Sequence, residues 1–171
     1  MIRQTLKVGI VTVSDRCSTG KRQDESGGFL KKRMAAAGWL LVSYEVVPDE
    51  EKGIRNTLTR LADKEKVDLI LTTGGTGLSP RDVTPEATKK VIKKEIPGIS
   101  EMMRIKSSNK SPYAVLSRGI SGFRKNTLVV NLPGSPKGVK ECLEIILPVI
   151  PHALEIMKGG KAHHHHKKNK L

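Results

Sequence analysis

The chain has 171 residues and a formal net charge of +14, with 37% hydrophobic and 3% aromatic residues. This length indicates one domain with a substantial core. No apolar run approaches the roughly 18 residues of a membrane helix, and so few aromatic residues are unfavourable for the base-stacking surfaces of single-strand binders. We therefore expect no membrane and no nucleic-acid partner, and a surface that attracts small anions.

The two ends of the chain and its cysteines indicate the compartment. The first residues lack the apolar core and cleavage site of a signal peptide, and Cys17 and Cys142 lack CxxC spacing. We expect a cytoplasmic protein with two free thiols. Residues 1–158 are expected to form a single domain, and residues 159–171, rich in lysine and histidine, a disordered tail.

Apolar runs and amphipathic segments alternate along the chain. Buried strands are expected at residues 6–13, 40–47, 67–71 and 127–132, and residues 17–25 as a loop. Helices are expected at residues 30–37, at 54–61, from the hydroxyl cap Thr84, and over 135–157 with a break near Pro148, while residues 95–113 should hold one or two short helices. This alternation predicts an α/β fold with a parallel sheet and helices on both faces.

Polar turn segments follow the four predicted strands. They comprise residues 14–16, 48–50, 72–84 and 131–138. The carboxyl ends of parallel strands meet at one edge of a sheet, which is where open α/β sheets bind their ligands. We therefore expect a ligand site along this edge.

The segment TTGGTG, residues 72–77, has the composition of an anion-binding loop. Glycines let the backbone turn tightly and approach a ligand, and successive backbone N–H groups can converge on a phosphate or carboxylate. It is neither a P-loop, since GxxxxGK[ST] is absent, nor a dinucleotide fingerprint, since Pro80 stands where glycine is needed. Spacing alone leaves open a tight turn without a ligand.

A second loop, NLPGSPKG at residues 131–138, has similar properties. Pro133-Gly134 favours a turn, and Ser135-Pro136 favours a helix start, whose free N–H groups and dipole attract an anion. Lys137 adds a positive charge. A serine-capped helix that binds nothing remains an alternative for this loop.

Two acidic residues follow different strands. If the fold brings Asp49 and Asp82 together beside the phosphate-binding loops, the two carboxylates would bind Mg²⁺. This ion takes one or two carboxylates together with phosphate oxygens. Each also fits a turn or helix-start residue. From the residues alone we therefore expect an α/β protein that binds a phosphorylated ligand, with the reaction left open.

Five segments together closely resemble the molybdopterin adenylyltransferases, the Mog proteins of molybdenum-cofactor synthesis, which are related to the G domain of gephyrin. These are VVPDE (46–50), LTTGGTG (71–77), SPRDVTPEAT (79–88), LSRGISG (116–122) and NLPGSPKG (131–138). The resemblance implies a three-layer α/β/α fold, a homotrimer, and transfer of AMP from ATP to molybdopterin with release of pyrophosphate. It also suggests a molybdenum insertase as a partner.

The resemblance assigns roles to residues at the matching positions. Asp49 and Asp82 are implied to be catalytic and to hold Mg²⁺ on the reacting phosphates. Arg81 and Arg118 fit clamps on phosphate oxygens. The implied binding positions for substrate or nucleotide are Ser14, Asp15, Thr73, Gly74, Gly75, Thr76, Gly77, Arg81, Ser117, Arg118, Pro133, Gly134 and Ser135.

Two other functions are compatible with the sequence. A non-catalytic molybdopterin-binding or scaffolding protein of the MoaB type would keep the fold without turnover, although a pure binder has less need of paired aspartates. Non-specific nucleic-acid binding would depend on the basic surface and fall steeply with salt.

Overall fold

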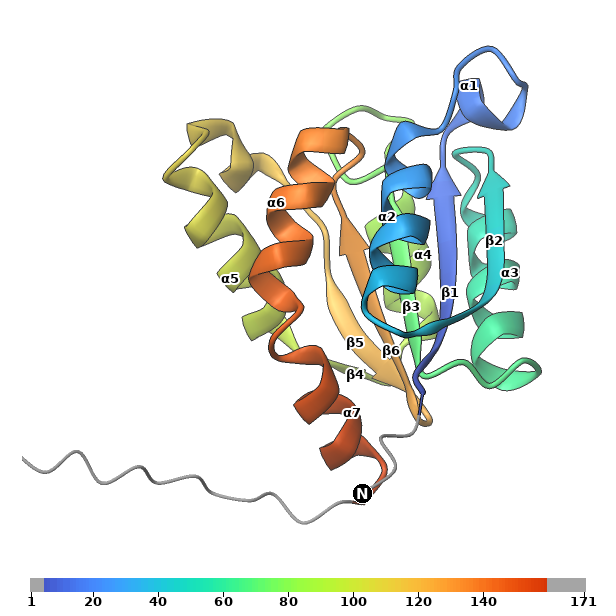
Figure 1. The fold of residues 1–171 in the computed structure, drawn as a ribbon. Coiled ribbons are helices and arrows are strands. Elements are labelled where there is room, and N and C mark those ends of the chain that lie inside the picture. Colours follow the sequence, from blue (N-terminus) through green and yellow to red (C-terminus); the bar gives the residue numbers. More distant parts are fainter. Residues whose placement is uncertain (1–4, 160–171) are drawn as a thin grey trace, which may run out of the picture.

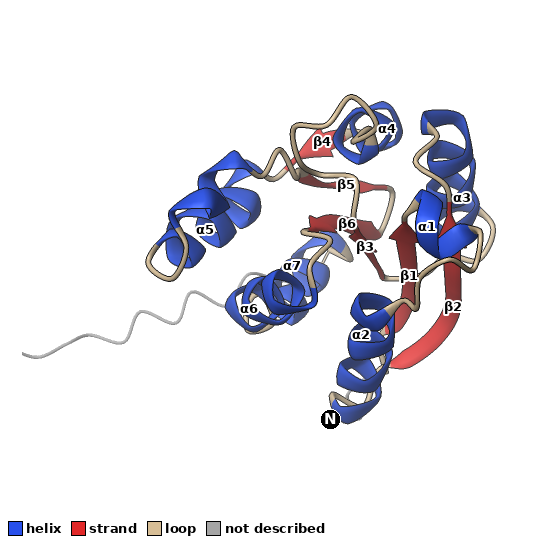
Figure 2. Cartoon of the chain, turned by 90° about the horizontal axis from the view of Figure 1, so that it is seen from above, coloured by secondary structure: helices blue, strands red, loops and turns tan. Residues whose placement is uncertain are grey.

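The computed structural model describes residues 5–159, which form a six-stranded sheet between two layers of helices (Figures 1 and 2). The strand order is β2-β1-β3-β6-β5-β4. The first four strands in this order are parallel, and β5 and β4 continue the sheet as antiparallel strands. The strands are β1 (Lys7–Val13), β2 (Leu40–Val47), β3 (Leu69–Thr73), β4 (Lys94–Glu95), β5 (Ser121–Arg124) and β6 (Thr127–Leu132).

The helices divide between the two faces of the sheet (Figure 2). Helices α2, α5, α6 and α7 pack on one face, α3 and α4 on the other, and the short α1 lies beyond the carboxyl end of β1. The helices are α1 (Asp15–Ser18), α2 (Glu25–Ala36), α3 (Glu51–Asp63), α4 (Thr84–Val91), α5 (Pro97–Ser108), the 3₁₀ helix η1 (Pro112–Leu116), α6 (Pro136–Ile146) and α7 (Ile150–Met157).

The central strands are buried on both faces. In β1, Val8 and Ile10 face α2 and α6, whereas Val11 and Val13 face α3 and α4. Alternate residues thus enter two separate cores, so a parallel strand between helix layers needs a continuous apolar sequence. The predicted α/β fold and its three layers are confirmed.

Several local predictions differ from the structure. The third strand begins at Leu69 rather than Val67 and continues to Thr73, because Thr72 and Thr73 pair with both β1 and β6. Residues 95–113 contain the twelve-residue helix α5, and Cys17 lies in the short helix α1 rather than in a loop. The short strands β4 and β5 were not predicted, since KE and SGFR have too few apolar residues to read as strands.

The carboxyl-terminal segment of the domain follows the prediction. The long apolar pattern divides into α6 and α7 on either side of Pro148, which cannot donate a helical hydrogen bond. Both cysteines are free. None of the helices within residues 5–159 has the length and apolar character to cross a membrane. Residues 1–4 lie outside the described residues, as do residues 160–171 of the tail predicted at 159–171.

Candidate functional site

The carboxyl ends of four parallel strands meet at the upper edge of the sheet in Figure 1. Val13 pairs with Val47, Thr12 with Thr73, and Thr73 with Leu132, so β1, β2, β3 and β6 end at the same level. The polar segments predicted to form a ligand site therefore lie side by side. They follow Val13, Val47, Thr73 and Leu132.

The glycine loop, defined as residues 74–77, packs directly against the end of β1. Gly74 and Gly75 have φ angles of +96° and +61°, a region that other residues seldom occupy. A Cβ atom on Gly74 would lie 2.2 Å from the carbonyl oxygen of Val13, and one on Gly75 would lie 2.3 Å from Oγ1 of Thr84. The backbone path of this loop therefore requires glycine at both positions.

The second turn, defined as residues 133–135, contacts the glycine loop. A Cβ atom on Gly134 would lie 3.2 Å from the Cα of Gly74. The Thr73 hydroxyl donates a 2.7 Å hydrogen bond to the Pro133 carbonyl, which fixes the turn against the end of β3. Ser135 caps α6 by accepting from the N–H of Gly138, as predicted. The two loops thus form one unit.

Thr84 has a different role from the predicted helix cap. Its hydroxyl donates to the Gly74 carbonyl at 2.9 Å, and its backbone N–H donates to the Gly75 carbonyl at 3.0 Å. The N-cap residue of α4 is Val83, which offers no side-chain acceptor. Thr84 is fully buried behind the glycine loop, so its hydroxyl stabilises the loop rather than the helix end.

Asp49 is held beside the glycine loop by a reciprocal pair of hydrogen bonds with Asp15. The N–H of Asp15 donates to Oδ2 of Asp49 at 2.8 Å, and the N–H of Asp49 donates to Oδ1 of Asp15 at 3.0 Å. The other oxygen of Asp49, Oδ1, lies 3.1 Å from the place of a Cβ on Gly75. One carboxylate oxygen is thus anchored, and the other faces the glycine loop.

Asp82 approaches the same loop from the other side. Its Oδ2 accepts a 2.8 Å hydrogen bond from the N–H of Ser79 and lies 2.9 Å from the place of a Cβ on Gly77. Burial raises the pKa of the Asp49 carboxyl, and the negative charges of Asp15 and Asp82 raise it further. Asp49 and Asp82 therefore flank one short loop and interact electrostatically.

The two predicted phosphate clamps also bind protein groups. Arg81 makes a bidentate ion pair with Asp15, with its Nη2 2.8 Å from Oδ2, and this ion pair lowers the pKa of the Asp15 carboxyl. Arg118 donates from Nε to the Gly77 carbonyl at 2.7 Å, and its other nitrogens bind the Asp82 carbonyl and Glu86. Both arginines thus position the loops that carry the carboxylates.

A larger cavity of about 680 Å³ opens on one side of the two loops, within the size range of ligand pockets. It contains eight of the predicted residues and a wall from α5, η1 and α6 that sequence reasoning missed. The predicted residues are Gly75, Thr76, Gly77, Asp82, Ser117, Pro133, Gly134 and Ser135. The missed residues include Ser100, Met103, Arg104, Ser107, Tyr113, Glu141 and Cys142, whereas Asn131 and Lys137 belong to the predicted loop at residues 131–138.

A smaller, polar cavity of about 250 Å³ opens on the other side, between β1, α2 and α6. It contains the predicted residues Ser14, Thr73, Gly74, Gly134 and Ser135 and adds Thr12, Cys17, Arg22, Asp24 and Ser26. Gly134 and Ser135 therefore border both cavities.

The smaller cavity lies beside a buried hydroxyl that is unpaired within the described residues, and beside the start of α2. Thr12 is 4% exposed, and its Oγ1 has no hydrogen-bond partner. A buried polar group in this state is costly unless a ligand or water satisfies it. Asp24 caps α2 by accepting from the N–H of Gly27 at 2.8 Å, so the start of this helix also borders the cavity. The motif D-x-S-G at residues 24–27, at a helix start, is the sequence signal that could have located this wall.

Within the described residues, no third side chain joins the two carboxylates of the predicted metal pair. Within residues 5–159, no group of three or more histidine, cysteine or acidic residues could hold a metal ion. Mg²⁺ commonly uses one or two carboxylates and completes its shell with phosphate oxygens and waters. Two carboxylates beside an open loop fit such an ion.

The family described as "Probable molybdopterin binding domain" matches residues 9–152 of the chain. The chain belongs to this molybdopterin-binding family. It is 42% identical over 159 residues to the molybdopterin adenylyltransferase of Helicobacter pylori strain J99, covering 92% of this chain and 90% of that protein. It is 39% identical over 171 residues to the molybdopterin adenylyltransferase of Escherichia coli K12, covering 91% and 87%.

Solved structures from the MoaB branch of the family are similar as well. The structure described as the molybdopterin biosynthesis enzyme MoaB from Thermus thermophilus superimposes with a TM-score of 0.83 at 51% identity, covering 91% of this chain and 98% of that chain. The molybdopterin-binding fold is therefore shared with both branches, and overall identity does not separate them.

The strained conformation of Gly75 gives a first prediction. Replacement by alanine should lower the free energy of unfolding by about 1–3 kcal/mol, because a Cβ is unfavourable at this φ and would meet Thr84. Urea denaturation measures the change. Gly53→Ala is the matched control, because a Cβ at that position of α3 meets open space; equal stability of the two variants would contradict the assignment.

The opposite pKa shifts of Asp49 and Asp15 give a second prediction. The raised pKa of Asp49 means that its carboxylate is less stable in the folded protein than in the unfolded chain. The resulting loss of folding stability is complete above the pKa of the folded state and disappears below the unfolded pKa of about 3.9. Asp49→Asn should therefore be at least as stable as the parent at neutral pH.

Asp15→Asn is the matched control, because the pKa of Asp15 is shifted in the opposite direction from that of Asp49. The lowered pKa of Asp15 contributes stability above its unfolded pKa, and this stability is lost as the pH falls through its folded pKa. The Asn variant should be less stable than the parent at neutral pH and equal to it in acid. Denaturation curves at neutral and acid pH measure both differences, and a loss of stability at pH 7 for Asp49→Asn would contradict the assigned shift.

Proposed function

We propose that this chain is a molybdopterin adenylyltransferase, which transfers AMP from ATP to the terminal phosphate of molybdopterin. The similarity to curated adenylyltransferases over about nine-tenths of both chains supports this activity. The observation that carries the mechanism is the position of Asp49 and Asp82, whose carboxylates both lie against the glycine loop, with Asp82 also bordering the larger cavity. This arrangement suits a reaction that brings two phosphorylated substrates together.

The reaction joins two anions. An oxygen of the molybdopterin phosphate attacks the α-phosphorus of ATP, a new P–O bond forms, and the bond to the β-phosphate oxygen breaks to release pyrophosphate. The chain must therefore hold like-charged groups in line and offset their repulsion. Adjacent cavities that share Gly134 and Ser135 can hold the two substrates with their phosphates at the common border.

Asp49 and Asp82 would hold Mg²⁺ beside the glycine loop. When bound, the ion neutralises charge on the reacting phosphates. The oxygen Oδ1 of Asp49 is directed to the glycine loop, while Oδ2 is fixed by the N–H of Asp15. The chain thus presents one preoriented oxygen from Asp49 instead of a mobile carboxylate.

The glycine loop and the start of α6 would bind the phosphates. Backbone N–H groups of a tight glycine turn and of a helix start donate to anionic oxygens. Arg118 binds the carbonyls of Gly77 and Asp82 and thereby fixes the segment between these two residues. No covalent intermediate is required, and the cysteines take no part.

A third prediction concerns the two aspartates. Asp49→Asn and Asp82→Asn should each slow adenylyl transfer by about tenfold or more, because each variant removes a charge from the metal site. The measurement is pyrophosphate release from ATP, Mg²⁺ and molybdopterin, with pterin retention followed in parallel. Glu155→Gln is the matched control, an exposed acid on α7 at the opposite end of the molecule from the site.

The result also separates the enzyme from a MoaB-like binding protein, the alternative favoured by the 51% identity to the Thermus MoaB structure. A binding protein retains molybdopterin and releases no pyrophosphate in any variant. Unchanged turnover in both aspartate variants would remove these residues from the mechanism.

The assembly is a further part of the proposal. We infer a homotrimer in the cytoplasm that delivers its product to a molybdenum insertase, on the basis of the family resemblance. A fourth prediction is that light scattering at micromolar concentration gives three times the chain mass of 18.7 kDa. A monomeric mass would contradict the trimer and leave the site intact.

A further inference from the structure

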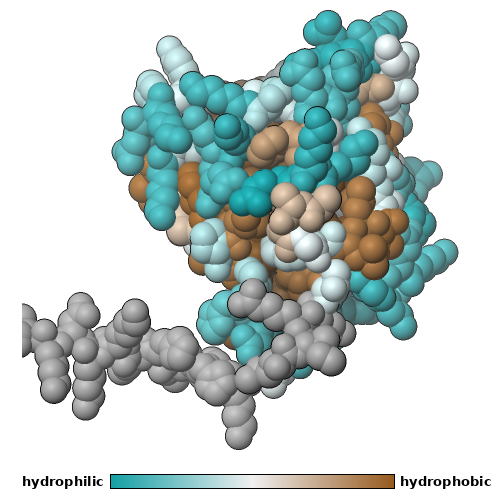
Figure 3. All heavy atoms as spheres, viewed as in Figure 1, coloured by the Kyte–Doolittle hydropathy of each residue, from teal (hydrophilic) through white to brown (hydrophobic). Residues whose placement is uncertain are grey.

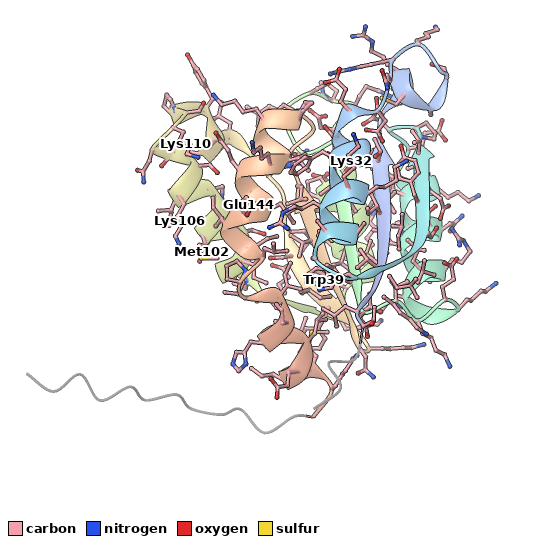
Figure 4. All side chains as sticks on the ribbon, in the orientation of Figure 1. Lys32, Trp39, Met102, Lys106, Lys110 and Glu144 are labelled. Atoms are coloured by element: carbon pink, nitrogen blue, oxygen red, sulfur yellow. The ribbon has the colours of Figure 1, made fainter. Side chains whose placement is uncertain are left out.

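A basic groove runs between α5 and α6 beside the larger cavity. We call it the lysine groove and define it by Lys106 and Lys110 on α5 and by Lys137 and Lys140 on α6. Its volume is about 600 Å³. Figure 3 shows hydrophilic side chains gathered over α5 and the upper turns of α6, and Figure 4 shows Lys106 and Lys110 on the face that also carries Glu144.

The positive charge of the lysine groove is only partly neutralised. Glu141 pairs with Lys110 at 3.7 Å, and Glu144 pairs with Arg33 of α2 at 2.8 Å. Lys106, Lys137 and Lys140 are exposed and form no ion pair within residues 5–159. Three ammonium groups therefore remain available at the groove.

The lysine groove is continuous with the larger cavity. Lys137 and Glu141 border both, and Lys137 lies in the first turn of α6, directly after the turn at residues 133–135. An anion that leaves the loops through this side of the cavity meets Lys137 first and then Lys140 and Lys106. The groove thus extends the anion-binding edge of the sheet along the molecular surface.

We propose that the lysine groove is a secondary binding site for linear polyphosphate, either the triphosphate of the incoming nucleotide or the departing pyrophosphate. Several ammonium groups along one groove match a chain of phosphates better than a single ammonium group does. Their combined positive potential raises the local concentration of an anion and its rate of capture. The proposed binding of polyphosphate is argued from the charges of the groove alone. The role of this binding in turnover rests on the proposed adenylyl transfer.

The binding test uses inorganic tripolyphosphate and pyrophosphate as probes. In calorimetric titrations, the double variant Lys106→Ala/Lys140→Ala should bind tripolyphosphate about threefold to tenfold more weakly than the parent at low salt, and the salt dependence of binding should decrease. Lys52→Ala/Lys64→Ala is the matched control. It removes the same charge from the end regions of α3, on the opposite face of the sheet, and should change binding little.

Turnover distinguishes the two sources of polyphosphate. If the groove captures ATP, Lys106→Ala/Lys140→Ala lowers kcat/KM for ATP with kcat retained. If it captures the product, kcat/KM is retained and inhibition by pyrophosphate weakens.

Two results would overturn the groove proposal. One is a double variant that binds tripolyphosphate as tightly as the parent, and the other is an equal loss in the Lys52→Ala/Lys64→Ala control, which would mean a net-charge effect. Because the binding test needs no turnover, a chain that fails to adenylylate molybdopterin refutes the proposed function and leaves the groove assignment standing.

Discussion

The close approach of the glycine loop to the end of β1 is the constraint on which the site depends. Gly74 lies so near the Val13 carbonyl that a Cβ there would be 2.2 Å from the oxygen. This approach lets the loops after β1, β3 and β6 share a small volume and lets Asp49, from the end of β2, reach Gly75. Larger side chains would separate these loops and with them the two carboxylates.

The same arrangement has an electrostatic cost in the free protein. Asp49 is partly buried beside the charges of Asp15 and Asp82, and its pKa is raised in consequence. The surrounding loops reduce this repulsion, since Arg81 pairs with Asp15 and Arg118 binds the backbone next to Asp82. Residual like-charge strain of this kind is typical of sites whose function is to bind a cation or a charged reaction centre.

The sequence predicts this architecture well where local rules determine it. Continuous apolar runs identify β1 and β6 because both of their faces are buried, and the polar turns after them identify the ligand edge. The glycines of residues 74–77 could be recognised because few other residues adopt their backbone angles. Motif resemblance then supplied Asp49 and Asp82, which the fold brings to one loop.

Side-chain partners were harder to predict because they depend on long-range packing. Arg81 and Arg118 were expected at phosphates, and their bonds to a carboxylate and to carbonyls of distant segments were not foreseen. The hydroxyl of Thr84 similarly bonds Gly74, ten residues earlier, instead of capping its helix. The α5 wall of the larger cavity was missed because residues 95–113 were expected only to hold one or two short helices, and the spacing of Ser100, Met103 and Ser107 does not indicate a ligand.

Gly134 and Ser135 separate the two cavities by a single turn of backbone. An occupant that displaces this turn from one side necessarily reshapes the pocket on the other. Thermodynamic reciprocity then requires that each occupant alter the affinity of its neighbour by the same factor. Any such displacement would couple the two pockets energetically, and their dissociation constants would then be properties of the pair.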